Sequence, residues 1–230
     1  MESDRKGVWA PIEDELLRVL SLPLDCLAAA EHQVLPVGAA EEWGIPEADR
    51  AALREWGLPR LPLFTPRPQV GIDPVLVPNL AGDHERRLVK EGQRLYDLGF
   101  WGPAEDSCVV GVVPGEGRVL RLLPAPITVD DLPEILRPHH AGLHKPAVSL
   151  FSSSIAQYVE TAWRWHAALQ ILRQIESPPH MAPEGEVVTH YDRLYACVDL
   201  IVDAVRRLDP GIAAEDRQSV WTELIREGSV

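Results

Sequence analysis

The sequence predicts an α+β fold, in which helices precede and follow an antiparallel or mixed sheet centred on a β-hairpin. Three observations lead to this class. Two β-branched or apolar runs, at 108–113 and 118–123, are separated by a short glycine turn. Apolar residues recur at helical spacing through the last third of the chain. Strands and helices do not alternate as they would in a parallel sheet.

Two short helices are expected in the first part of the chain. Pro11 and the acids behind it predict a short helix that stops near Pro23, because proline suits the first helical position and acids suit the first turn. The segment 46–56 predicts a second helix, closed by Gly57 where a left-handed cap is favoured. Prolines interrupt the apolar pieces of 58–78, so edge strands or extended loop are expected there.

The hairpin is the clearest β signal. Its four-residue turn, 114–117, contains two glycines. The strand before the turn is apolar throughout, which is typical of a strand covered on both faces.

The last third is expected to be mainly helical. A strand at 147–151 leads to three serines that can cap a helix over 155–175. Apolar positions from Tyr191 to Leu208 recur at spacings of three and four and predict a second amphipathic helix, ended by Asp209-Pro210-Gly211. A last helix is expected at about 213–226.

We expect residues 1–230 to form a single domain, with residues 1–45 as an N-terminal extension that adds a helix to the core or contributes to an interface. The best apolar run, 109–113, is far shorter than the roughly 20 residues of a membrane span. The mixed charge of Met1 to Lys6 is not typical of a secretory or transit signal. A cytoplasmic protein without a membrane association is therefore expected.

Acidic side chains outnumber basic ones by 35 to 22, and the formal net charge is −13. Such a field repels phosphate backbones, so direct nucleic-acid binding is disfavoured and a basic partner is favoured. The three cysteines are far apart and include no C-x-x-C pair. Reduced, buried thiols are expected rather than disulfides or a zinc site.

The segment with His139, His140 and His144, with Asp130 and Asp131 upstream, is the strongest candidate for metal binding. Its proline and glycine predict a loop, however, and helical i, i+4 geometry does not follow for these histidines. A solvated loop is the favoured interpretation, and no cofactor is expected.

No motif in the sequence indicates catalysis. The glycines at 115 and 117 join two strands, so no helix N-terminus is available there to receive a phosphate. The serines at 152–154 lack the G-x-S-x-G pattern and are explained by helix capping. No H-E-x-x-H, Walker or kinase signature is present.

The acidic pairs are better explained as a docking face. Summed charge is enough to steer a partner, whereas acid–base catalysis needs facing carboxylates. Trp101 lies beside Glu105 and Asp106 in a predicted loop, where an aromatic ringed by charge can anchor a partner, although core packing of this ring is an equal alternative. The predicted partner-binding residues are Trp101, Glu105, Asp106, Asp130, Asp131 and Glu134.

Six segments of the chain form a recognisable series, in this order: Glu55–Pro59, Leu95–Gly99, Gly117–Val119, Leu150–Val159, Leu208–Pro210 and Trp221–Ile225. The series resembles the SUKH superfamily of bacterial immunity proteins, in its actinobacterial branch. The resemblance covers roughly residues 45–227 and implies an α+β fold that binds and neutralises a cognate protein toxin, often a nuclease or deaminase of a polymorphic toxin system. Members often carry Asn where Ser152 stands, and serine also caps a helix.

The main hypothesis is therefore a non-enzymatic immunity protein that occludes a basic toxin. Two alternatives stay open at this point: a metal-dependent enzyme that uses His139, His140 and His144, and an intracellular scaffold of the same fold with several partners.

Overall fold

The computed structural model describes residues 6–28, 33–34, 37–59, 64–66, 69–101, 108–175, 177–179, 181–215 and 219–227. Its centre is a five-stranded antiparallel sheet with the strand order β11-β8-β7-β6-β4. Three further strand pairs lie outside this sheet: β1 with β3, β9 with β10, and the parallel pair β2 with β5. The strands are β1 (Gln33–Val34), β2 (Val37–Gly38), β3 (Leu58–Pro59), β4 (Phe64–Pro66), β5 (Gln69–Val70), β6 (Tyr96–Trp101), β7 (Val109–Val112), β8 (Val119–Leu122), β9 (Ile127–Thr128), β10 (His144–Lys145) and β11 (Val148–Ser152).

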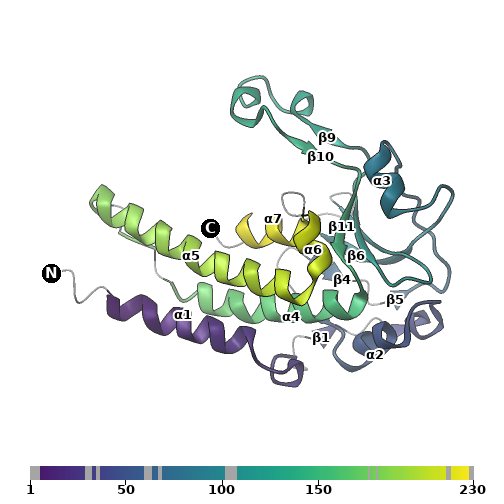
Figure 1. Ribbon diagram of the computed structural model, residues 1–230, viewed down its shortest axis with the longest axis horizontal. Coiled ribbons are helices and arrows are strands. Elements are labelled where there is room, and N and C mark those ends of the chain that lie inside the picture. Colours follow the sequence, from purple (N-terminus) through teal and green to yellow (C-terminus); the bar gives the residue numbers. More distant parts are fainter. Residues whose placement is uncertain are drawn as a thin grey trace.

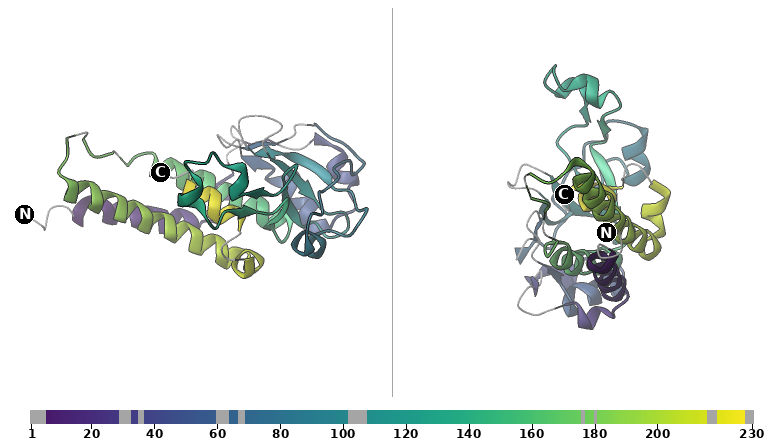
Figure 2. Two further views of the ribbon diagram at one scale, coloured as in Figure 1. Left: turned by 90° about the horizontal axis from the view of Figure 1, so that it is seen from above. Right: turned by 90° about the vertical axis from the view of Figure 1, so that its left-hand side faces the viewer.

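The helices confirm the predicted α+β class. Helices α1, α4 and α5 pack against one another and extend away from the sheet (Figures 1 and 2). The helices are α1 (Lys6–Leu20), α2 (Glu47–Glu55), α3 (Asp83–Leu88), α4 (Ile155–Leu172), α5 (Glu184–Leu208), α6 (Pro210–Glu215) and α7 (Val220–Glu227), with short 3-10 turns η1 (Leu24–Cys26), η3 (Ala39–Glu42), η4 (Val129–Asp131) and η5 (Arg137–His140).

The predicted hairpin is confirmed as β7 and β8, paired with Val112 opposite Val119. Both faces of β7 are covered, as its apolar sequence predicts. Val110 and Val112 belong to the main core under α4, while Val113 belongs to a smaller cluster on the other face. This alternation places hydrophobic side chains in two cores on either side of one strand.

Some boundaries differ from the prediction. Helix α1 begins at Lys6, so Pro11 lies inside the helix rather than at its start. Leu16, Val19 and Leu20 are buried in the main core, which explains how packing holds this helix despite the lost proline donor. The predicted final helix is replaced by α6 and α7, which leave residues 216–218 outside the described part of the chain.

The junction between β11 and α4 joins several parts of the fold. Asp209, fully buried after α5, accepts hydrogen bonds from the backbone N–H (2.7 Å) and hydroxyl (2.6 Å) of Ser153. Asp49 of α2 accepts one from the backbone N–H of Ala156 at 2.8 Å. Ser154 caps α4 by accepting from the N–H of Gln157. Carboxylates are favourable at a helix N-terminus, which offers unpaired N–H groups and the positive end of the helix dipole.

The turn of the β7–β8 hairpin presses against this junction. Gly117 has a φ of +73°, and a Cβ atom placed on it would lie 1.8 Å from Oδ2 of Asp49. Burial raises the pKa of Asp49, and the N–H groups of Ala156 and Ile155 oppose that rise. The turn, α2 and the start of α4 are therefore tightly fitted to one another.

We predict that Gly117→Ala destabilises the protein by about 3 kcal/mol or more, because a left-handed alanine costs about 1–2 kcal/mol and the clash with Asp49 adds to it. Gly92→Ala is the matched control: Gly92 has a φ of +75°, and nothing lies within 4 Å of its added Cβ. That variant should lose only the cost of the left-handed backbone, about 1–2 kcal/mol. Urea unfolding measures both, and equal losses would contradict the tight fit at Asp49.

Candidate functional site

An arm, residues 127–145, projects from the body of the molecule (Figure 1). It leaves through β9 and returns through β10, which pair antiparallel with Thr128 opposite His144. Between these strands lie η4 and η5, neither of which contains a buried residue. The arm therefore presents its side chains to solvent instead of contributing to a core.

Polar contacts brace the arm from within. The Asp131 carboxylate accepts hydrogen bonds from the backbone N–H (2.7 Å) and hydroxyl (3.0 Å) of Thr128, and this N–H lowers the pKa of Asp131. The Arg137 side chain donates to the carbonyl oxygens of Asp130 and Leu132, each at 3.0 Å. Asp131 thus has a structural role in the capping box at the start of η4. Asp130 accepts the hydrogen bond of Arg137 through its backbone carbonyl oxygen and not through its carboxylate.

The base of the arm is tied to the body by a partly buried ion cluster. Glu223 of α7 pairs with Lys145 of β10 and, at 2.8 Å, with Arg121 of β8. Arg121 is buried and also donates to the Ser149 hydroxyl of β11. Burial raises the pKa of Glu223, but Arg121 and Lys145 lower it by more, so the net shift is downward. The arm therefore leaves the sheet from an anchored base.

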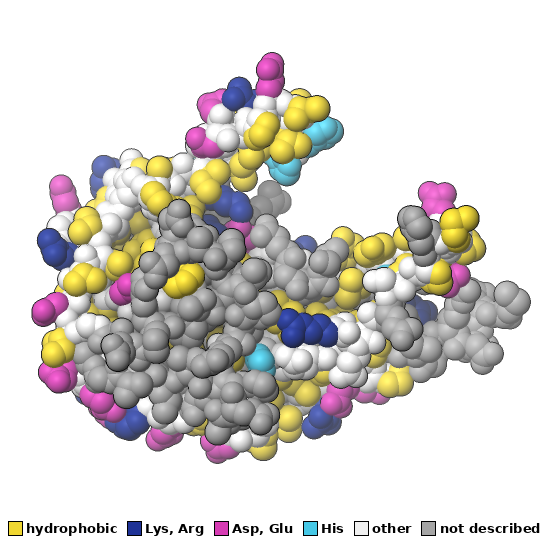
Figure 3. Space-filling model, turned by 180° about the vertical axis from the view of Figure 1, so that it is seen from behind, with side chains coloured by type: hydrophobic (Ala, Val, Ile, Leu, Met, Phe, Trp, Pro, Cys, Tyr) yellow, Lys and Arg dark blue, Asp and Glu magenta, His cyan; other side chains and the backbone are white. Residues whose placement is uncertain are grey.

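The far end of the arm combines apolar and acidic groups. Ile135 is 80% exposed and Leu136 is 42% exposed, beside the exposed acids Asp130 and Glu134. Figure 3 shows that the acidic side chains gather on the outer side and tip of the arm, whereas hydrophobic and histidine side chains line the side that faces a hollow in the molecular surface. An apolar centre with a charged rim is the usual composition of a protein-binding surface.

Of the other predicted binding residues, only the backbone of Trp101 belongs to the described part of the chain. Trp101 is the last residue of β6, paired with Phe64, so its placement in a loop was wrong; its side chain, Glu105 and Asp106 lie outside what the structure describes. Phe100, Val109, Leu122 and Val148 form one row across β6, β7, β8 and β11. Leu122, five residues before the arm begins at Ile127, lies about 10 Å from the end of β6 at two strand spacings. The strand that leads into the arm and the backbone of Trp101 therefore lie at one end of the sheet.

The histidine-rich segment is part of the arm, and His139, His140 and His144 are all exposed. Among the described residues, no three His, Cys, Asp or Glu side chains are placed so that they could hold a metal ion. His139 and His140 lie in η5 and His144 begins β10, so the segment is not irregular throughout as predicted.

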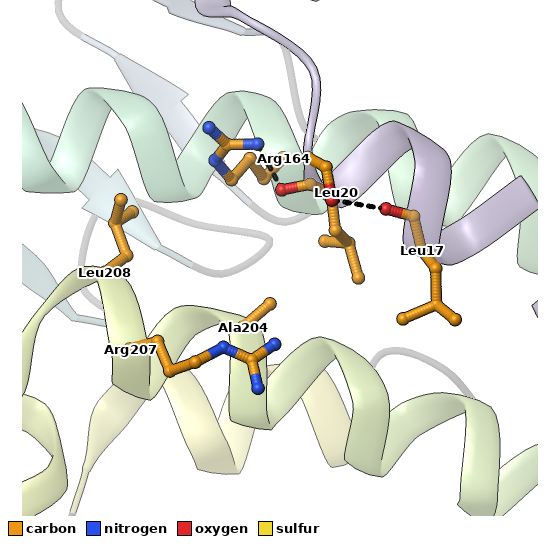
Figure 4. Close-up of a pocket in the computed structure, with 7 residues that line it drawn as sticks. Leu17, Leu20, Arg164, Ala204, Arg207 and Leu208 are labelled. Carbon is orange, nitrogen blue, oxygen red and sulfur yellow. Dashed lines mark hydrogen bonds between the residues drawn. The ribbon is translucent and has the colours of Figure 1, made fainter.

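A separate groove of about 290 Å³ lies between α1, α4 and α5 (Figure 4). Arg164 of α4 donates to the carbonyl oxygen of Leu20 and to the Glu160 carboxylate. A cation at the C-terminal end of α1 satisfies carbonyl groups that the helix leaves unpaired. This arginine attaches α1 to the core, so the groove is explained by helix packing.

The exposed apolar residues of the arm were missed by the sequence reasoning. Ile135 and Leu136 lie between Pro133 and Pro138 in a segment without helical or strand periodicity. Two adjacent aliphatic residues in a proline-bounded polar loop are a signal that could have identified them, because a loop has no core of its own in which to bury such residues.

The described residues thus form an α+β fold from which an arm with exposed apolar and acidic side chains projects. Residues 27–227 match the model of the SUKH-4 immunity protein family, and the chain belongs to that family. Membership indicates a toxin-neutralising immunity protein, implies a non-enzymatic role and confirms the resemblance seen in the sequence. Neither a curated protein nor a solved structure matches the chain. Within the described residues, no helix has the length and apolar character needed to span a bilayer.

We predict that Glu223→Gln destabilises the protein by about 3 kcal/mol at pH 7, because Arg121 then lacks its counter-charge in a buried setting. The pKa of Glu223 is below its ordinary value of 4.5. The stability that this carboxylate contributes is therefore present above pH 4.5 and is lost as the pH falls through its folded-state pKa. Urea unfolding between pH 3 and 7 should show the difference from wild type shrinking on the acid side.

Asp199→Asn is the matched control, because it removes another acid paired with α7, through Arg226 at 2.9 Å, but one whose side chain is 60% exposed. Its effect should stay within about 1 kcal/mol. Equal losses for the two variants would show that burial of the cluster at the base of the arm contributes nothing.

Proposed function

We propose that this protein is the cytoplasmic immunity partner of a basic protein toxin of a polymorphic toxin system, of nuclease or deaminase type, and that it neutralises the toxin by occlusion. The single observation that carries this proposal is the family match over residues 27–227. The structure supports it with an anchored arm whose apolar end is exposed to solvent.

The charge of the protein favours a basic partner. A net charge of −13 raises the local concentration of cationic surfaces and speeds their association. Enzymes that act on nucleic acids carry cationic surfaces for phosphate contacts. An acidic protein that covers such a surface competes with the nucleic-acid substrate for the same cationic side chains, so binding alone inhibits the toxin.

The arm is the first contact that we assign to this interface. Asp130 and Glu134 steer the partner, while Ile135 and Leu136 supply apolar area that leaves water on binding. Asp131 supports the arm through its bonds to Thr128. Trp101, Glu105 and Asp106 are proposed to extend the acidic contact.

The proposal is tested by producing the toxin domain encoded beside this gene together with the protein in a susceptible bacterium. Growth should be restored by the wild-type protein, and purified toxin and immunity protein should form a stable complex in gel filtration. Growth arrest that persists despite soluble immunity protein, with no complex formed, would contradict the proposal.

We predict that the double reversal Asp130→Lys/Glu134→Lys slows association with the toxin domain about tenfold at low ionic strength, since steering by rim charges acts mainly on the association rate. The effect should decline as salt is added. Stopped-flow fluorescence at several salt concentrations measures it.

Glu42→Lys/Asp73→Lys is the control with the same change in net charge. Both residues are exposed, in η3 and after β5, in the part of the molecule away from the arm (Figure 1). A similar slowing in both double variants would mean that only total charge matters and that the arm has no special place in the interface.

A further inference from the structure

A second set of exposed hydrophobic side chains lies on α5. Val188 is 52%, Tyr191 39% and Tyr195 49% exposed. Their spacing of three and four residues places them on adjoining parts of one helix face. We call these three residues the α5 stripe. Tyr191 is the first residue of the apolar series, Tyr191 to Leu208, that the sequence predicted for the buried face of this helix. Val188 and Tyr195 do not belong to that series.

The ion pair between Asp199 and Arg226 shows which way this face is turned. Arg226 belongs to α7, so the side of α5 that carries Asp199 is directed toward α7. Positions 188, 195 and 199 follow one another at intervals of seven and four residues, which keeps them on one side of a helix. Val188 and Tyr195 thus continue along the side of α5 that faces α7.

The stripe extends beyond the part of α5 that α7 covers. Asp199 pairs with Arg226 near the C-terminal end of α7, and Val188 lies about 16 Å further along α5 at 1.5 Å per residue. Figure 1 shows the N-terminal half of α5 reaching past α7, and Figure 3 shows the hollow between this end of the molecule and the arm. α7 is also bonded to the base of the arm through Glu223 and Lys145. The arm and the α5 stripe therefore stand on either side of α7.

Resting on the proposed function, we infer that the α5 stripe is a second contact surface for the toxin domain, which seats a convex, basic part of its surface in the hollow between the stripe and the arm. The apolar centre of this interface is Ile135 and Leu136 on one side and the stripe on the other. The exposed charged residues beside these anchors are Asp130, Glu134 and Arg137 on the first side and Glu184 and Asp192 on the second, so acids outnumber bases. Apolar anchors in a mainly acidic surrounding fit a partner with apolar residues surrounded by Lys and Arg.

The charge pattern decides between possible occupants. A second copy of this chain carries the same net charge of −13 and the same acidic rims. Bringing these rims together would place like charges opposite one another, which is unfavourable at an interface. A basic partner removes this repulsion, so the hollow is assigned to the toxin and not to a homodimer.

Two contact sides also explain why the arm needs a fixed base. A partner held from both sides requires the distance between arm and stripe to be maintained before binding, because ordering them at that moment would weaken the complex. The cluster of Arg121, Lys145 and Glu223 fixes the arm, and α7 packs against α5 in the main core, where Trp221 and Val198 are both buried.

The decisive test is the affinity of Val188→Ser/Tyr195→Ala for the toxin domain encoded beside this gene, measured by calorimetry with a catalytically inactive toxin. We expect binding to weaken at least tenfold, since truncation of buried aromatic anchors typically costs more than 1.4 kcal/mol. Both residues are exposed, so the fold should be retained, as circular dichroism and thermal unfolding can verify.

Ile72→Ser/Val77→Ala is the matched control, because these aliphatic residues are 53% and 73% exposed and lie in the segment between β5 and α3. It should bind with wild-type affinity. A photo-crosslinking amino acid at 195, and separately at 135, should label the toxin, whereas one at 77 should not.

The outcomes separate the two proposals. Wild-type affinity of the α5 double variant, together with crosslinks from position 135 alone, would overturn the second contact surface but leave the proposed function standing. No binding of the toxin by the wild-type protein would overturn both. Crosslinks from 195 to another copy of this chain, with a dimer in light scattering that the α5 double variant dissolves, would show that the stripe serves self-association.

Discussion

The rest of the structure depends on the junction where β11 becomes α4. Two buried carboxylates, Asp49 and Asp209, satisfy backbone N–H groups there, and they come from parts of the chain far apart in sequence. An uncapped helix start at this depth would leave donors without partners, each at a cost of about 1–3 kcal/mol. One set of hydrogen bonds thus joins α2, the sheet, α4 and the end of α5.

Aromatic side chains pack beside this junction and connect it to α7. Phe151, Tyr158 and Trp221 meet with ring centroids 5.0–5.5 Å apart, and the Trp221 indole N–H donates to the Ser152 hydroxyl. This contact holds α7 against β11. Helix α7 also carries Glu223, which pairs with Lys145 of the arm, and Arg226, which pairs with Asp199 of α5. The packing of Trp221 therefore positions a helix that contacts both the arm and α5. The two parts of the proposed binding surface, the arm and α5, are thus connected to the junction through α7.

Local sequence signals identified much of this architecture. The glycine turn predicted the β7–β8 hairpin, the three serines predicted the start of α4, and Gly57, with its φ of 55°, closes α2 as expected. These signals work because turns, caps and amphipathic periodicity are imposed by residues close together in sequence. Strand β6 was not predicted. It contains Gly99, which adopts a φ of 143° at an irregularity in its pairing with β7, and a glycine inside a strand weakens the strand pattern in the sequence.

The candidate site was predicted only in part. The acids at 130, 131 and 134 were identified from charge, and all three are exposed. Asp131 differs because it completes a capping box with Thr128, three residues earlier, a spacing that the sequence reasoning did not use. Ile135 and Leu136, and the exposure of Val188 and Tyr195, were not predicted. Periodicity shows that a helix has an apolar face, but not where along its length that face lacks a neighbour.

The sequence by itself determined the α+β class, the acidic character, the capping serines and the membership in a family of immunity proteins, because each is written in composition or in short-range order. Only the tertiary structure decided that residues 127–145 form an arm, that Arg121, Lys145 and Glu223 meet at its base, and that Val188, Tyr191 and Tyr195 stay exposed on α5. Those facts depend on contacts between residues up to a hundred positions apart, and such contacts follow from how whole elements pack rather than from any local pattern.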